Sequence, residues 1–112
     1  MSASDIYDTL LQMNGLAFED GHVDAAYHAL AAATHMADDL GDSDRLKHLA
    51  TIAMEQGTRV NDDHHRLSAE GAAGRGTNGV FVSLGGTIRA MLLRLEGQAI
   101  VDRNRAEASG QL

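Results

Sequence analysis

Apolar residues recur along most of this chain at intervals of three and four, the period of an amphipathic α-helix. The clearest helix covers residues 25–40, AAYHALAAATHMADDL, which contains neither proline nor glycine and is followed by Gly41. Alanine has the highest helix propensity, and glycine is typical of the position after a helix. The small side chains of this helix let neighbouring helices approach closely, while its large side chains fill a core. The small residues are Ala26, Ala29, Ala33 and Ala37, and the large ones are Tyr27, Leu30, Met36 and Leu40. We therefore expect a central helix.

A first helix is predicted over residues 5–19, with Ser2 or Ser4 as its N-terminal cap. Its apolar positions follow the helical period and are Ile6, Tyr7, Leu10, Leu11, Met13, Ala17 and Phe18. Gly21 lies in the short connection to the second helix, where it can adopt a positive φ. Two helices joined by so short a loop are expected to form an antiparallel hairpin.

One set of large and small residues in this hairpin consists of Leu10, Met13, Ala17, Gly21, Ala26, Leu30 and Ala33. Over residues 7–40 this pattern resembles a single tetratricopeptide repeat, in which small residues lie where the two helices of a unit touch. The glycine that usually follows the first large residue and the proline that usually closes the unit are missing. A second unit starting near Asp44 matches only at Leu46, Leu49, Ala53 and Gly57, whereas arrays normally need three or more units. The resemblance implies binding of proteins or peptides rather than catalysis.

A third helix is predicted over residues 43–68, after a turn and cap at residues 41–44. Its apolar seam follows steps of four and three and consists of Leu46, Ala50, Ala53, Gly57, Val60, His64 and Leu67. Gly57 either separates two helices or lies inside one long helix, where it costs roughly 1 kcal/mol relative to alanine. We favour the long helix.

The glycine-rich residues 71–79 are predicted to form a loop. A last helix is expected from a cap at Asn78 to about Ala106, although the Gly85-Gly86 pair could kink it or delay its start to Thr87. Residues beyond that helix are expected to fray. The chain is thus predicted to be all-α, a single-domain bundle of four or five helices.

Composition restricts the classes of partner. Sixteen acidic and nine basic residues give a formal charge of −7, which disfavours nucleic-acid binding because phosphates are repelled. There is no cysteine, and therefore neither a disulfide nor a thiolate metal site. No stretch approaches the roughly 20 apolar residues of a membrane span, and the N-terminus, MSASDIYD, lacks the features of a signal peptide. We expect a cytoplasmic protein without a membrane or nucleic-acid partner.

The last helix carries large apolar residues on more than one face, namely Leu84, Ile88, Met91, Leu92, Leu93, Leu95, Ile100 and Val101. This is more than a small bundle needs to cover. We therefore predict a homodimer formed through this helix, with an interface made by Leu84, Ile88, Met91, Leu92 and Leu95.

The densest group of polar residues is the run Asn61 to Arg66. It offers Asp62, His64 and His65 as candidate metal ligands, because carboxylates and imidazoles bind zinc and other transition metals. Adjacent residues diverge by about 100° on a helix, so at most one of the two histidines can face a given site. Without a further ligand from elsewhere, a polar helix end is the simpler interpretation. No cofactor is predicted.

Residues 74–79, GRGTNG, formally match the G-x-G-x-x-G motif that binds pyrophosphate between a strand and a helix. A helix precedes the motif here, so we interpret it as a connector. Arg75, with Arg66 and the backbone donors at the start of the last helix, could still hold a small anion.

No arrangement of nucleophile, base and acid is recognisable in the sequence, and the neighbouring carboxylates fit solvated helix ends. We therefore expect a non-enzymatic helical module for protein–protein interaction or regulation. The alternative is a small metal- or anion-binding protein that uses residues 62–66 and Arg75. An enzymatic cleft formed only in the dimer is a third hypothesis.

Overall fold

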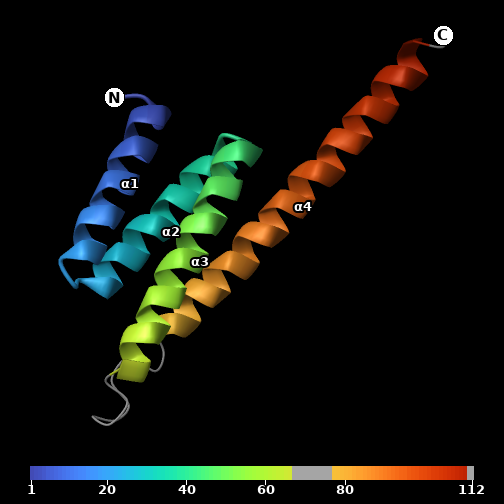
Figure 1. Cartoon of the computed structure of the whole chain (residues 1–112). Coiled ribbons are helices and arrows are strands. Elements are labelled where there is room, and N and C mark those ends of the chain that lie inside the picture. The colour runs from blue at the N-terminus through green and yellow to red at the C-terminus, as the bar shows by residue number, and fades with distance from the viewer. Residues whose placement is uncertain (67–76, 111–112) are drawn as a thin grey trace.

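Four α-helices and no strand make up the described part of the chain, residues 1–66 and 77–110, in a computed structural model (Figure 1). In chain order they are α1 (Ala3–Glu19), α2 (Val23–Asp39), α3 (Ser43–Arg66) and α4 (Thr77–Gly110). The predicted all-α bundle with an N-terminal hairpin is confirmed. No helix within these residues is both long enough and apolar enough to cross a membrane.

The ends of the N-terminal hairpin follow local sequence signals. The Ser2 hydroxyl accepts a hydrogen bond from the Asp5 amide at 3.1 Å, and the Asp5 carboxylate accepts one from the Ser2 amide at 3.0 Å. This reciprocal capping box satisfies donors that the first turn of a helix leaves unpaired. Gly21 and Gly41 reverse the chain at φ values of +84° and +63°, which other residues adopt only at a cost of about 1–2 kcal/mol. The predicted cap at Ser2 and turn at Gly21 are confirmed.

Helix α2 is central, as predicted, because it contacts all three other helices. Figure 1 shows two antiparallel hairpins, α1 with α2 and α3 with α4, in which α1 and α3 run in the same direction. The buried face of α2 combines small alanines with two larger side chains and consists of Ala26, Leu30, Ala33, Thr34 and Ala37. Leu40, expected in the core, is 44% exposed because it is the C-cap after the last helical residue.

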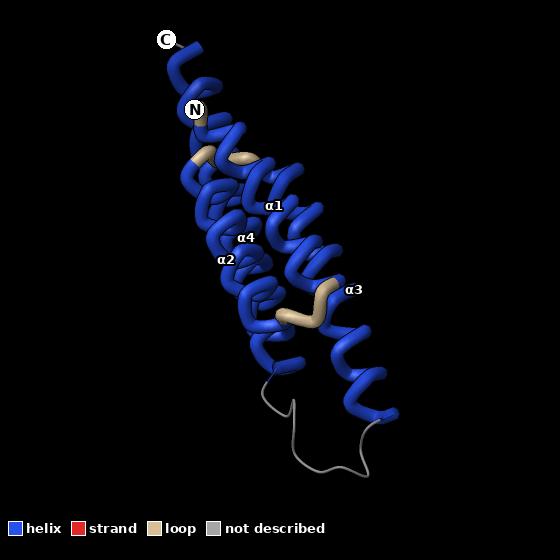
Figure 2. Tube along the Cα trace, turned by 90° about the vertical axis from the view of Figure 1, so that its left-hand side faces the viewer, coloured by secondary structure: helices blue, strands red, loops and turns tan. Residues whose placement is uncertain are grey.

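The helices form a thin, elongated molecule whose Cα trace measures 69 × 30 × 14 Å. The start of α1 and the end of α4 lie at the same end of the bundle (Figures 1 and 2). Helix α4 extends well beyond the ends of the other three helices (Figure 1). The core therefore covers only part of α4. The largest fully buried side chains are Leu30, Thr34, Leu46, Leu49, Phe81 and Ile88.

The buried face of α1 differs from the predicted apolar stripe. Ile6 and Met13 are 36% and 57% exposed, whereas the buried residues are Tyr7, Asn14 and Phe18. These three residues lie on one helical face, at intervals of seven and four. Tyr7 and Phe18 belong to the predicted stripe, whereas Asn14 does not, because the prediction considered only apolar residues.

Helices α3 and α4 are each continuous through their glycines. Helix α3 contains Gly57 without interruption, which confirms the long helix. Helix α4 includes Gly85 and Gly86 and runs from Thr77, so Asn78 lies inside it rather than capping it. It also continues past the predicted end at Ala106 to Gly110. Tertiary packing explains the early start, because buried apolar residues in the first turns of α4 offset the poor helix propensity of glycine.

Candidate functional site

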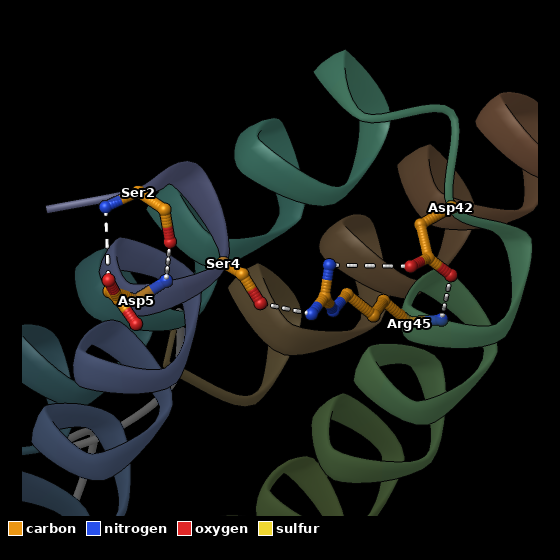
Figure 3. A network of polar contacts seen from close by, with 5 residues as sticks. All are labelled: Ser2, Ser4, Asp5, Asp42 and Arg45. Carbon is orange, nitrogen blue, oxygen red and sulfur yellow. Dashed lines mark hydrogen bonds and ion pairs between the residues drawn. The ribbon is translucent and has the colours of Figure 1, made fainter.

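A seam of polar contacts joins the parallel helices α1 and α3. At its upper end, the Arg45 guanidinium donates to the Ser4 hydroxyl at 2.6 Å and pairs with the Asp42 carboxylate at 3.4 Å (Figure 3). Asp42 also accepts from the Arg45 amide at 3.0 Å and so caps α3. One arginine therefore ties the start of α3 to the start of α1.

Tyr7 lies beneath this arginine, whose guanidinium carbon is 4.8 Å from the ring centroid. That distance is within the range of a cation–π contact. The Tyr7 hydroxyl is buried and has no hydrogen-bond partner among the described residues. Burial raises the pKa of this hydroxyl, and the positive charge of Arg45 partly opposes that shift. A phenol with a raised pKa stays neutral at physiological pH, so this group is suited to packing rather than proton transfer.

At the centre of the seam, two buried amides face each other. Asn14 Nδ2 donates to Gln56 Oε1 at 3.0 Å, and Gln56 Nε2 donates to Asn14 Oδ1 at 2.8 Å. Asn14 Nδ2 also donates to the Ala26 carbonyl at 2.7 Å. Asn14 and Gln56 are only 2% and 8% exposed. The pair thus connects α1, α2 and α3 at one level of the core.

At its lower end, the seam contains a second arginine stacked on a second aromatic ring. The Arg59 guanidinium carbon lies 4.9 Å from the Phe18 centroid, and Arg59 Nη1 contacts Glu19 Oε1 at 2.6 Å. The hydrogen bond and the positive charge of Arg59 hold the pKa of Glu19 below its ordinary value. Together, the three levels of the seam hold α1 and α3 in one parallel alignment.

The contact between Arg59 and Glu19 can be tested through the pKa of the Glu19 carboxyl. In Arg59→Gln, we expect the Glu19 pKa to rise to its ordinary range, measured by NMR titration of the side-chain carboxyl. The pKa of the Glu19 carboxyl is lower in the folded chain than in the unfolded chain, where it is about 4.3. The pair with Arg59 therefore stabilises the fold above the unfolded pKa, and this stabilisation is lost as the pH falls through the folded pKa. Arg89→Gln, on α4, is the control and should leave Glu19 unchanged. An unchanged Glu19 pKa in Arg59→Gln would contradict the contact.

A groove with a volume of about 730 Å³ lies between α3 and α4. Five of its twelve lining residues are alanine or glycine, and Met54 and Val82 on its rims are 68% and 66% exposed. The lining residues are Ala50, Ala53, Met54, Gly57, Thr58, Asn61, Phe81, Val82, Gly85, Gly86, Arg89 and Leu92. Small residues let the backbone of an incoming helix approach closely, and the apolar rims favour an apolar partner.

A smaller groove of about 460 Å³ lies between α1 and α3. Charged and amide side chains contribute to its lining, including Gln12, Glu19, Glu55 and Arg59. Glu19 and Arg59 already contact each other across it. The α3–α4 groove is therefore the better candidate for an apolar ligand.

The structure divides the residues predicted for a dimer interface into two groups. Leu84 and Ile88 are 6% and 0% exposed in the chain's own core, so a second copy cannot contact them. Met91, Leu92 and Leu95 are partly buried against that core. The large apolar residues of α4 that remain exposed are Val82, Leu93, Ile100 and Val101, at 66%, 62%, 51% and 44%. The outward face of α4 is thus an apolar surface that the described core of the chain does not cover.

The predicted metal and anion ligands fall largely outside the described side chains. Asp62 is exposed near the end of α3, whereas Arg75 lies outside the described residues. His64, His65 and Arg66 belong to the last turn of α3, and their side chains are also outside the described set. Among the side chains that are described, no group of three or more His, Asp or Glu could hold a metal ion. The proposed metal and anion sites stay predictions.

Comparison with known proteins identifies no relative of this chain. No family model, curated protein or solved structure matches the chain.

Proposed function

We propose that this chain is a helical protein–protein interaction module whose α3–α4 groove binds the apolar face of a partner helix. The observation that carries the proposal is the groove itself, whose lining includes five alanines and glycines and whose apolar rims at Met54 and Val82 are exposed. Burial of such rims contributes roughly 25 cal/mol per Å² of apolar surface. A helix laid in a groove is a common mode of peptide recognition.

Two further features support this proposal. The polar seam holds α3, which forms one side of the groove, against α1, so this side is fixed within the bundle before a partner binds. The tetratricopeptide-like pattern of residues 7–40 agrees with a role in binding proteins or peptides.

The groove can be blocked without disturbing the fold. A Cβ added at Gly86, which lines the groove, meets no atom within 4 Å, so Gly86→Arg places a large side chain at the groove while gaining helix propensity. The test is a display selection of helical peptides with apolar residues at positions i, i+4 and i+7, on sparsely immobilised chains that cannot contact one another. We expect wild-type protein to enrich such peptides and Gly86→Arg to lower their recovery at least about tenfold.

Ala25→Arg, which adds the same charge at an exposed position of α2, is the matched control and should recover peptides as wild type does. Circular dichroism of both variants checks that their helices are intact. Equal recovery by wild type and Gly86→Arg, or no enrichment at all, would overturn the proposed function.

A further inference from the structure

We infer that the partner helix in the α3–α4 groove carries a carboxylate that pairs with Arg89, so that this arginine selects which helices the groove binds. The inference rests on the proposed function, because it names the chemistry of the ligand of the same groove. Arg89 is the only charged residue among the twelve described residues that line this groove. A carboxylate opposite this charge gives the contact a specificity that burial of apolar surface alone does not supply.

The side chain of Arg89 is available to a ligand. It is exposed, and its guanidinium forms neither a hydrogen bond nor an ion pair with any residue that the structure describes. In contrast, Arg45, Arg59 and Arg94 each pair with a carboxylate of the chain itself. A charge that docking removes from water is costly unless it gains a partner of opposite charge. A helix that lays its apolar face over the groove therefore needs a carboxylate beside Arg89.

The position of Arg89 within the groove determines where that carboxylate lies. On α4 the lining residues extend from 81 to 92, so Arg89 lies toward one end. Val82 and Arg89 are seven residues apart, which places them on one face of α4, about 10 Å apart along its axis. Gly85 and Gly86 lie between them and present no side chain to a bound helix. The bound helix should therefore place its carboxylate about two turns from the residue that contacts Val82.

The charge of the whole chain makes this expectation more specific. A formal charge of −7 repels acidic peptides at long range. Acidic residues elsewhere on the partner helix therefore weaken its encounter with the chain, whereas the carboxylate beside Arg89 forms an ion pair. We expect the preferred helix to combine an apolar face, one carboxylate near one end of that face, and a neutral or basic outer face.

The display selection of helical peptides tests this preference when every position outside the apolar face is randomised. With wild-type protein, we expect Asp or Glu to be enriched at one position near one end of the apolar face and depleted elsewhere. Arg89→Gln should lose this enrichment while still recovering peptides with the apolar face, and Arg89→Glu should favour Lys or Arg at the same position. Arg105→Gln removes the same charge from an exposed position outside the groove and should keep the wild-type preference.

Fluorescence anisotropy with one selected peptide, and with the same peptide after its selected carboxylate is changed to an amide, measures the ion pair directly. The amide form should bind wild type about threefold or more weakly, and both forms should bind Arg89→Gln equally. Circular dichroism checks that the variants keep their helices. Peptides without a positional preference for acid, or a preference that Arg89→Gln retains, would overturn this inference and leave the proposed function intact. No enrichment of apolar helices at all would overturn both.

Discussion

Replacing Phe81 with alanine is expected to lower the free energy of unfolding by about 3–5 kcal/mol, the cost typical of deleting a buried aromatic side chain. Phe81 is 1% exposed, and its ring meets Phe18 of α1 and Tyr27 of α2 edge to face, at centroid distances of 6.3 and 6.0 Å. Such ring pairs contribute about 0.5–1.5 kcal/mol beyond the buried area. Phe81 thus joins α4 to the N-terminal hairpin.

Urea unfolding followed by circular dichroism measures this change. The free energy of unfolding of a domain is usually about 5–15 kcal/mol. The loss in Phe81→Ala should therefore move the midpoint of unfolding to a much lower urea concentration. Phe81→Leu is the control and should cost less, because it keeps most of the buried volume while removing both ring contacts. Val82→Ala, one position further on an exposed site, should change stability by no more than about 0.5 kcal/mol. Equal effects at Phe81 and Val82 would contradict the aromatic junction.

The positions of the helices were largely predictable because they depend on local signals. A capping serine, glycines at the two reversals and an alanine-rich central segment act within a few residues of one another. The start of α4 was less predictable. Glycine favours a loop at Gly79, but the burial of Phe81, Leu84 and Ile88 against other helices outweighs that preference. Contacts distant in sequence cannot be read from a local pattern.

The candidate site was harder to predict than the fold, for a physical reason. In the sequence, the large apolar residues of α4 form one set, and the structure divides them between the core and the outward face. Leu84 and Ile88 belong to the core, whereas Leu93 and Ile100 belong to the outward face. Which face of a helix is covered depends on where its neighbours end. Here, the other three helices are too short to cover residues 96–110 of α4, which are all exposed (Figure 1).

The buried amides were missed altogether, because a periodicity of apolar residues gives no weight to Asn14 or Gln56. A polar residue in the centre of an apolar face is usually evidence against burial. In this chain the two amides satisfy each other across the core. The available signal was weak: Asn14 lies between Tyr7 and Phe18 at helical spacing, and Gln56 lies between Ala53 and Val60 in the same way. Matching polar residues on two apolar faces suggest a contact only after the helices are aligned.

Removing only one of these two amides is expected to lower the free energy of unfolding much more than removing both. Asn14→Leu leaves the Gln56 amide buried without its partner, and an unsatisfied buried group costs about 1–3 kcal/mol. Gln56→Met should cost a similar amount, because the carbonyl oxygen of Asn14 loses its donor. The double variant replaces both groups with apolar side chains of similar size and should recover most of the loss.

Urea unfolding of the wild type, the two single variants and the double variant gives the coupling energy between the amides, expected to be about 1–3 kcal/mol. Gln12→Leu, at an exposed position of α1, is the control and should stay within about 0.5 kcal/mol of wild type. Additive losses in the double variant would show that the amides do not pair. Apolar side chains can slide past one another more freely than a hydrogen-bonded amide pair, which is satisfied at one register only. The amide pair therefore helps to set the alignment of α1 with α3, and the double variant should keep its stability while its NMR spectrum becomes less uniform.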